Sequence, residues 1–170
     1  SLFVGANQTE SAIHVDSGGT NFWLYLESGV KEWVFFDRPD KLYLYETPAS
    51  SHFEIDVFRP NMEKFPLYSL AKMYRTIQKP GELVFIPGGC PHAVKNWDDI
   101  HGFSMNYADA SNLGLFLFES IMDREFHDID DFVGDNLPDG LLEDQKDLTI
   151  GEFKSQDWIK YKKTGKLKFV

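Results

Sequence analysis

The 170 residues of this chain are enough for one domain with a substantial core, and a content of 42% hydrophobic and 15% aromatic residues excludes a disordered protein. The net charge of −10 disfavours nucleic acid as a partner, because basic side chains that neutralise phosphates supply most non-specific affinity. The single cysteine, Cys90, excludes an internal disulfide framework and indicates an intracellular compartment, the nucleus or the cytoplasm. No apolar run approaches the roughly 18 residues of a membrane span, so no membrane association is expected.

Residues 1–107 consist of short apolar runs separated by glycine, proline, asparagine and aspartate, a pattern typical of strands joined by turns. The strands are expected at 2–4, 11–16, 22–27, 32–37, 42–46, 55–59, 73–78, 83–86, 92–96 and 100–107. Many short strands at this spacing favour a sandwich or a closed barrel over a parallel α/β sheet. The segment 47–70 contains several prolines, which indicate an insertion of loops with little regular structure.

The pattern changes after residue 109, where apolar positions recur at helical spacing, at Leu113, Leu117 and Ile121. Two further short helices are expected at 141–147 and 150–161. An apolar helical face of this kind usually covers a core, and the alternative is that these C-terminal helices form a homodimer surface. We therefore expect a β core over residues 1–110 and a helical extension over 111–170 that packs on the same domain.

Charge is unevenly distributed along the chain. Between residues 119 and 147 aspartate and glutamate dominate, against Arg124 and Lys146. The simpler interpretation is a solvated helical surface. The alternative is an acidic rim that attracts a basic protein or peptide.

The most informative motif is the pair formed by His14 and Asp16. Residues two apart in a strand point to the same face, so this imidazole and this carboxylate converge. They are two of the three ligands in the two-His-one-carboxylate triad of non-haem Fe(II) oxygenases, and His92, after a strand and a Pro-Gly-Gly turn, is the candidate for the third. Taken singly, an H-x-D pair also arises as a structural hydrogen-bonded pair, and His92 as an ordinary buried histidine. The remaining histidines lack a carboxylate at ligand spacing and are interpreted as structural or surface residues: His52, His101 and His127.

Lys31 interrupts an otherwise apolar run. A buried lysine is costly unless an anion pairs with it. Lys31 therefore lies either at the exposed entrance of a strand, beside Glu32, or faces a carboxylate that arrives with a cosubstrate. Three polar side chains could add hydroxyl or amide donors, although each is also ordinary strand or turn polarity: Ser11, Asn96 and Ser104.

Three blocks of the sequence occur together, in this order and spacing, in one known family. They are 13–33, with Ile-His-Val-Asp, Gly-Thr and Gly-x-Lys-x-Trp; 81–92, with Val-Phe-Ile-Pro-Gly-Gly and the histidine; and 96–107, with the asparagine and Ser-x-Asn-Tyr. In these blocks the chain resembles the Jumonji-C (JmjC) 2-oxoglutarate oxygenases. It is most similar to their branch of arginine demethylases and lysyl hydroxylases, the phosphatidylserine-receptor-like proteins.

The resemblance implies a mainly β fold, a double-stranded β-helix (jelly roll, cupin-like) with C-terminal α-helices. It implies Fe(II) on His14, Asp16 and His92, with no further catalytic residue. It also implies contacts with 2-oxoglutarate or substrate: Lys31 on the distal carboxylate, Ser104 where the family often has threonine, and Asn96 and Ser11 at further positions.

Three details depart from the family pattern and bear on the cosubstrate contacts. Leu24 replaces an asparagine that contacts cosubstrate in related proteins, and Cys90-Pro91 replaces an aromatic pair. Ser11 is three residues from His14, so strand alternation places the two on opposite faces unless a bulge intervenes.

The expected activity is hydroxylation of a C–H bond in a lysine or arginine side chain of a basic protein or peptide, with Fe(II), 2-oxoglutarate and O₂. If the carbon is an N-methyl group, the same hydroxylation becomes a demethylation. One alternative is a catalytically weak binding module on the same fold, and another is a hydroxylase of tRNA or of a small molecule. A cupin of isomerase or storage type is disfavoured, because such proteins usually present a denser cluster of histidine and glutamate ligands.

Overall fold

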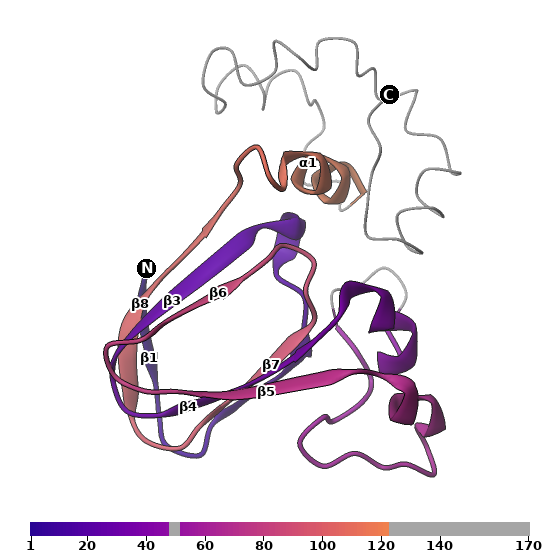
Figure 1. Cartoon of the computed structure of the whole chain (residues 1–170), viewed down its shortest axis with the longest axis horizontal. Helices are drawn as coiled ribbons and strands as arrows, with labels where there is room; N and C mark the ends of the chain where they lie inside the picture. The colour runs from indigo at the N-terminus through magenta and orange to yellow at the C-terminus, as the bar shows by residue number, and fades with distance from the viewer. Residues whose placement is uncertain (48–51, 123–170) are drawn as a thin grey trace.

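The computed structural model describes residues 1–47 and 52–122, and most of their regular structure is antiparallel β-strand (Figure 1). The strands are β1 (Leu2–Gly5), β2 (Glu10–His14), β3 (Asn21–Ser28), β4 (Lys31–Phe36), β5 (Met73–Gln78), β6 (Leu83–Ile86), β7 (His92–Asn96) and β8 (Ile100–Tyr107). The described helices are three short 3₁₀ helices, Ser17–Gly19, Arg38–Leu44 and Pro66–Leu70, and the α-helix α1 (Leu113–Met122).

The strands form two four-stranded antiparallel sheets, one in the order β1-β8-β3-β6 and the other in the order β2-β7-β4-β5. Apart from β4 and β5, each strand is followed by one in the opposite sheet, so the two sheets lie face to face around a common interior (Figure 1). This arrangement is a jelly roll, which confirms the expected mainly β fold. The expected strands outside the segment between β4 and β5 are all present, with ends close to those expected.

An apolar core fills the space between the sheets. Along β3, Phe22, Leu24 and Leu26 are buried, while Tyr25 and Glu27, which alternate with them, are exposed, as the two-residue period of a strand requires. The other buried members of this core come from β4, β6, β7 and β8: Trp33, Ile86, Val94 and Ile100. The interior face of the barrel is therefore largely apolar, and polar side chains on it need a specific explanation.

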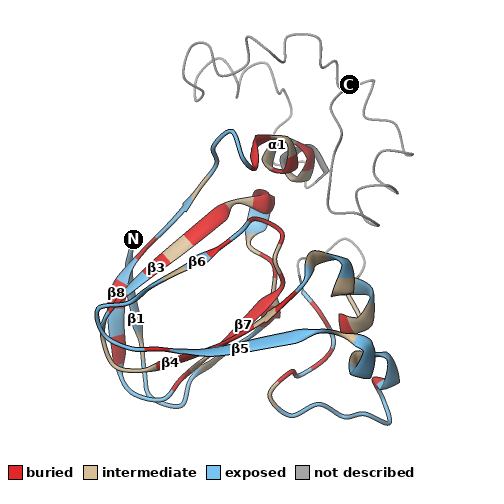
Figure 2. Cartoon of the chain, viewed as in Figure 1, coloured by how far each residue is buried: buried red, intermediate tan, exposed pale blue. Residues whose placement is uncertain are grey.

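The segment between β4 and β5 covers the outer face of the sheet β2-β7-β4-β5. It contributes the buried side chains of Leu44, Phe53, Ile55, Val57 and Phe65 to a second core. The sheet contributes Ile13, Val34, Phe36 and Ala93 to the same core, and Val15 joins them directly after β2. Because β4 is buried on both faces, its sequence reads as a nearly continuous apolar run, and Figure 2 shows β4 and β7 buried beside the exposed edge strand β5.

Two expected strands in this segment are wrong. Residues 42–46 belong mostly to the 3₁₀ helix Arg38–Leu44, which has a proline in its first turn and ends at Tyr45 in the left-handed conformation, with φ of 58°. Residues 55–59 form a turn, because the Asp56 carboxylate accepts the backbone N–H groups of Phe58 and Arg59 at 2.9 and 3.1 Å. Burial does alternate along this stretch, but no strand in the part of the chain that the structure describes pairs with it.

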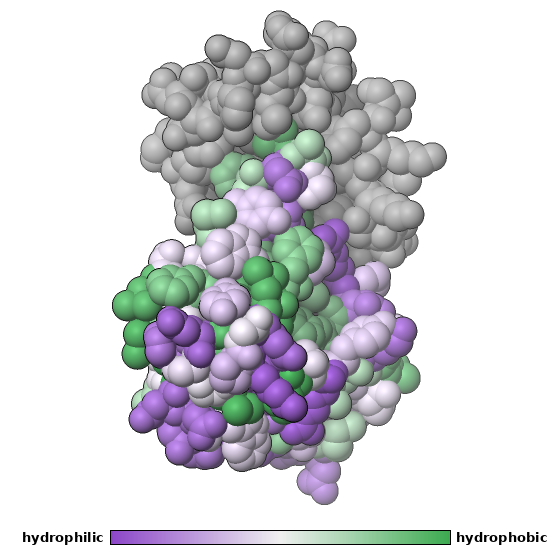
Figure 3. All heavy atoms as spheres, turned by 60° about the vertical axis from the view of Figure 1, so that its left-hand side comes forward, coloured by the Kyte–Doolittle hydropathy of each residue, from purple (hydrophilic) through white to green (hydrophobic). Residues whose placement is uncertain are grey.

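The outer face of the other sheet, β1-β8-β3-β6, carries exposed apolar side chains. They are Leu2, Val4, Tyr25, Leu83, Phe85, Phe103 and Met105. The register places these side chains opposite one another, and Figure 3 turns this side of the molecule forward. Within residues 1–47 and 52–122, no helix has the length and apolar content needed to cross a membrane.

Helix α1 packs at one end of the barrel against the 3₁₀ helix Ser17–Gly19 (Figure 1). Leu113, Leu115 and Phe118 are buried, so α1 turns apolar side chains inward at this end of the barrel. The Leu115 side chain lies so close to Gly19 that a Cβ there would clash with it.

The other expectations for the C-terminal part fall outside the described residues. They concern the helices at 141–147 and 150–161, His127, the homodimer surface and almost all of the acidic stretch that begins at residue 119. The division into a core over 1–110 and an extension over 111–170 stays a prediction.

Candidate metal centre

The structure brings His14, Asp16 and His92 together. His14 is the last residue of β2, and His92 is the first residue of β7 and lies directly opposite it. Their ring centroids are 4.3 Å apart. One ligand atom from each of the three residues lies within 4.8 Å of the other two, close enough to hold one metal ion.

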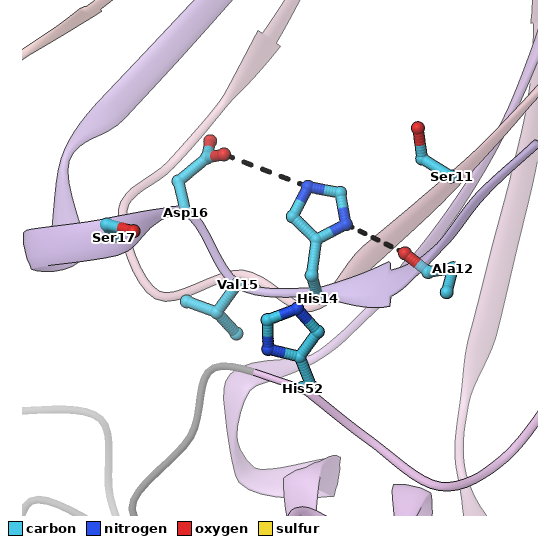
Figure 4. Close-up of a pocket in the computed structure, with 7 residues that line it drawn as sticks. All are labelled: Ser11, Ala12, His14, Val15, Asp16, Ser17 and His52. Carbon is cyan, nitrogen blue, oxygen red and sulfur yellow. Dashed lines mark hydrogen bonds and ion pairs between the residues drawn. The ribbon is translucent and has the colours of Figure 1, made fainter.

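Backbone carbonyls orient both imidazoles. The Nδ1 atom of His14 is 2.8 Å from the Ala12 oxygen, and the Nδ1 atom of His92 is 3.0 Å from the Cys90 oxygen. Because a carbonyl can only accept, each Nδ1 donates its proton and each Nε2 keeps a lone pair for a metal. The Nε2 atom of His14 lies 3.9 Å from Oδ1 of Asp16 (Figure 4).

Burial sets the charge states of the site. It lowers the pKa of His92 to about 4, with the nearby His14 adding to the effect, so the ring is neutral at physiological pH, as a metal ligand must be. Burial also raises the pKa of the Asp16 carboxyl, and its Oδ2 atom has no hydrogen-bond partner among the described residues. A buried carboxylate oxygen without a donor is costly, and a divalent cation would satisfy it. The donor set therefore fits the expected metal.

Two of the three candidate ligands, His14 and Asp16, line a pocket of about 330 Å³, whereas His92 does not (Figure 4). Its lining residues are Ser11, Ala12, His14, Val15, Asp16, Ser17 and His52. A bulge in β2 explains how Ser11 reaches it: Ser11 lies opposite Val94 and His14 opposite His92, so one extra residue restores both to the same face.

Lys31 is buried inside the barrel, with 2% of its surface exposed. Its Nζ atom donates to Oδ1 of Asn96 at 2.9 Å and lies 4.8 and 5.5 Å from the ring centroids of Phe3 and Trp33. No acidic side chain among the described residues pairs with it, and burial lowers its pKa to about 8. The alternative that places Lys31 at an exposed strand entrance is therefore wrong.

Lys31 and the metal ligands lie at different depths of the same interior. In the register of β4 and β7, Lys31 lies opposite Asn96 and Phe35 lies opposite His92. The two pairs are four residues apart along each strand, which corresponds to about 13 Å of extended chain. Ser104 is buried on β8 in the facing sheet. Four residues are expected to contact cosubstrate or substrate. Of these, Ser11 lines the pocket beside His14 and Asp16, whereas Lys31, Asn96 and Ser104 do not.

Two of the three departures from the family pattern, at Leu24 and at Cys90, place an apolar side chain and a buried thiol in the structure. Leu24 is 1% exposed and belongs to the core between the sheets. The Cys90 thiol donates to the Phe36 oxygen at 3.4 Å, and burial raises its pKa, so it resembles a structural turn residue more than a reactive thiol.

Sequence reasoning missed His52. Its sequence context predicts a structural or surface residue, and its exposure confirms this, but it also forms a β-bridge with His14 and lines the pocket. Its place depends on how the segment after β4 returns to the edge of β2, for which spacing offers no signal. His101, by contrast, is the surface residue expected, with Nε2 3.0 Å from the Glu27 carboxylate.

Comparison with known proteins agrees with this geometry. Residues 1–111 match the family described as a cupin-like domain. The HSPB1-associated protein 1 homolog of Danio rerio is 31% identical over 58% of this chain and 23% of its own length. The arginine-specific demethylase JMJ20 of Arabidopsis thaliana is 28% identical over 66% of this chain and 24% of its own length. The lysine-specific demethylase 7A of Homo sapiens is 27% identical over 92% of this chain and 17% of its own length.

The chain thus spans about a quarter or less of the length of these curated relatives. The matched region contains the jelly roll and all three candidate ligands. By the family match and by its relatives, the chain belongs to the cupin-like domain family, among proteins of the JmjC type.

Proposed function

We propose that the chain is an Fe(II)- and 2-oxoglutarate-dependent dioxygenase that hydroxylates a lysine or arginine side chain of a protein, or removes an N-methyl group from it by hydroxylation. The observation that carries this proposal is Lys31. Its ammonium is buried and has no anionic partner among the described residues, in the same barrel as a two-His-one-carboxylate set, and a carboxylate that comes with a cosubstrate explains this.

Each residue has a distinct part in this proposal. His14, Asp16 and His92 would hold Fe(II), which when bound supplies the activation of O₂ needed to hydroxylate an unactivated carbon. Lys31 binds the distal carboxylate of 2-oxoglutarate, and Asn96 holds the ammonium in place by accepting its hydrogen bond.

The surrounding interior side chains keep water out. Trp33 is 2% exposed, and its indole donates to Gln78 at 2.8 Å, which fixes a broad apolar wall beside Lys31. Leu24 and Ser104 face the same interior from the other sheet. A dry, shaped interior favours the charge pair and limits attack of the oxidant on the protein itself.

The choice of substrate is supported by the relatives and by charge. Two relatives are named for arginine-specific and lysine-specific demethylation. A net charge of −10 suits a basic protein or peptide as partner. We place the reaction in the nucleus or the cytoplasm, where the single free thiol, Cys90, stays reduced.

The deciding variant is Lys31→Met, which removes the ammonium and keeps most of the side-chain volume. We expect metal content to stay normal and the KM for 2-oxoglutarate to rise about 30-fold or more, because a charged partner left unpaired costs about 2 kcal/mol or more. Succinate formation at varied 2-oxoglutarate measures this, with metal content by mass spectrometry.

The matched control is Lys95→Met. Lys95 lies on β7 in the same sheet but pairs with Glu10 at 3.0 Å on the outer face, so its loss should leave the KM for 2-oxoglutarate unchanged. An unchanged KM in Lys31→Met as well would contradict the proposed role of Lys31.

A catalytically weak binding module is the second candidate, and Leu24 favours it. A buried leucine stands where the resemblance implies a cosubstrate-contacting asparagine, so one polar contact is missing. Anaerobic titration with Fe(II) and 2-oxoglutarate, followed by exposure to air, separates the two candidates. Binding without consumption of 2-oxoglutarate would favour the binding module.

A further inference from the structure

His52 continues a row of histidines across three neighbouring backbone segments. His92 lies opposite His14 across β7 and β2, and His52 lies opposite His14 on its other side, in an antiparallel bridge. Directly opposite residues in antiparallel chains direct their side chains to one face, with Cβ atoms about 4.5–5.5 Å apart. His52 therefore lies next to His14 in the backbone pairing, and both residues line the pocket (Figure 4).

On the side away from β2, the segment that carries His52 is hydrogen-bonded to residues 45–47. The backbone N–H of Thr47 donates to the His52 oxygen at 3.0 Å, and that of Glu54 donates to the Tyr45 oxygen at 3.0 Å. The next residue, Phe53, is 8% exposed and belongs to the core under the sheet. Because successive side chains alternate, burial of Phe53 turns His52 towards the pocket.

His52 is not one of the metal ligands. The only described group of residues whose ligand atoms converge closely enough for one ion is His14, Asp16 and His92, which already completes the expected triad. Nor does His52 fill the core, because its side chain is exposed. A histidine that is bridged to a candidate ligand through the backbone, lines the pocket and is exposed is placed to touch whatever enters that pocket.

We propose that His52 contacts the substrate at the entrance to the metal centre and helps to hold it, without binding metal or 2-oxoglutarate itself. This inference rests on the proposed function and adds a substrate-binding residue to the same site. An imidazole can accept or donate a hydrogen bond and can stack on a planar group, which suits the amides of a peptide and an arginine guanidinium. Ser11 and Ser17 add hydroxyl groups to the same pocket lining.

The test uses two variants, His52→Ala and His52→Gln, with His101→Ala as the control. His101 is also a histidine with an exposed side chain (47%), but it pairs with Glu27 on the outer face of the other sheet. The probes are fluorescein-labelled peptides with a single lysine, N-methyl-lysine or arginine among neutral residues. Their binding is measured by anisotropy with 2-oxoglutarate and Mn(II), a redox-inert substitute for iron.

We expect His52→Ala to weaken peptide binding and to raise the peptide KM by about tenfold, a loss typical of one well-placed contact residue. The kcat at saturating peptide should change less, and titrations should show unchanged affinities for Mn(II) and 2-oxoglutarate. His52→Gln, which can still make a hydrogen bond, should recover part of the peptide affinity. His101→Ala should behave as the unchanged protein does.

Two results would overturn the inference and leave the proposed function standing. The first is a peptide affinity in His52→Ala equal to that in His101→Ala. The second is a loss of Mn(II) affinity in His52→Ala as large as in His14→Ala, a reference variant that removes a candidate ligand. A different result separates failure of the proposed function. If the unchanged protein neither binds nor turns over any of the peptides, the protein-substrate proposal fails and the inference fails with it.

Discussion

At the scale of single residues, the site depends on polar groups that are buried before any ligand arrives. Within residues 1–47 and 52–122, one oxygen of Asp16 has no hydrogen-bond partner, and the only hydrogen bond of the Lys31 ammonium goes to a neutral amide. Each is costly for the fold by itself and is relieved by a charge of opposite sign. Sites of this kind exchange stability for function.

The pH dependence of stability should reveal the cost at Lys31. Burial lowers its pKa from 10.5 to about 8 in the folded protein. Between these values the unfolded chain keeps the proton and the folded protein has lost it, so the free energy of unfolding rises with pH through this window and is insensitive to Lys31 below it. The full change corresponds to about 3 kcal/mol.

Lys31→Met lacks this dependence. Its stability relative to the unchanged protein should therefore fall by up to about 3 kcal/mol between about pH 7 and about pH 10. Denaturant unfolding at several pH values, without metal or 2-oxoglutarate, measures the difference. A difference that stays constant with pH would mean that the ammonium is solvated in the folded state.

At the scale of elements, the segment between β4 and β5 packs on the outer face of the sheet that carries His14 and His92, the face that is turned away from the site. It returns along β2 to place His52. This segment has little regular structure, yet its apolar side chains make half of a core. Its contribution to stability should therefore be that of a core element.

Two leucines of one 3₁₀ helix test this. Leu44 is fully buried and Leu42 is 68% exposed. Leu44→Ala should lower the free energy of unfolding by about 2–5 kcal/mol, as large-to-small core substitutions do. Leu42→Ala should change it by about 0.5 kcal/mol at most. Equal losses measured by denaturant titration would mean that the segment is not docked on the sheet.

At the scale of the whole molecule, charge and apolar surface are both unevenly placed. The net charge is −10, and the acidic stretch 119–147 lies almost wholly outside the described residues. The sheet β1-β8-β3-β6 exposes an apolar outer face, on the opposite side of the barrel from the second core. The charge bears on the proposed basic substrate, because long-range attraction speeds encounter with a cationic chain.

Turnover should therefore be faster on lysine- and arginine-rich peptides than on neutral or acidic ones of equal length. The advantage should shrink as salt rises from about 0.01 to about 0.15 M, because the Debye length falls from about 30 to about 8 Å. Initial rates of 2-oxoglutarate consumption at both salt concentrations measure this. Equal rates on all three peptides, or turnover only on tRNA or a small molecule, would overturn the choice of substrate.

The sequence alone determined what neighbouring residues decide. Strand alternation predicts that His14 and Asp16 lie on one face. The turn residues predict where most strands begin and end, including the strand that starts at His92. The same local pattern misled at 42–46 and 55–59. There, Pro39 and the Asp56 carboxylate favour a 3₁₀ helix and a turn over strand pairing.

Only the tertiary structure decided which distant segments meet. It buried Lys31 against Asn96, brought Ser11 back to the face of His14 through a bulge, and set His52 beside the triad. These outcomes depend on the register between strands and on the burial of segments that are far apart in the chain. Periodicity within one strand carries no information about either, because a shift of one residue in register reverses every face.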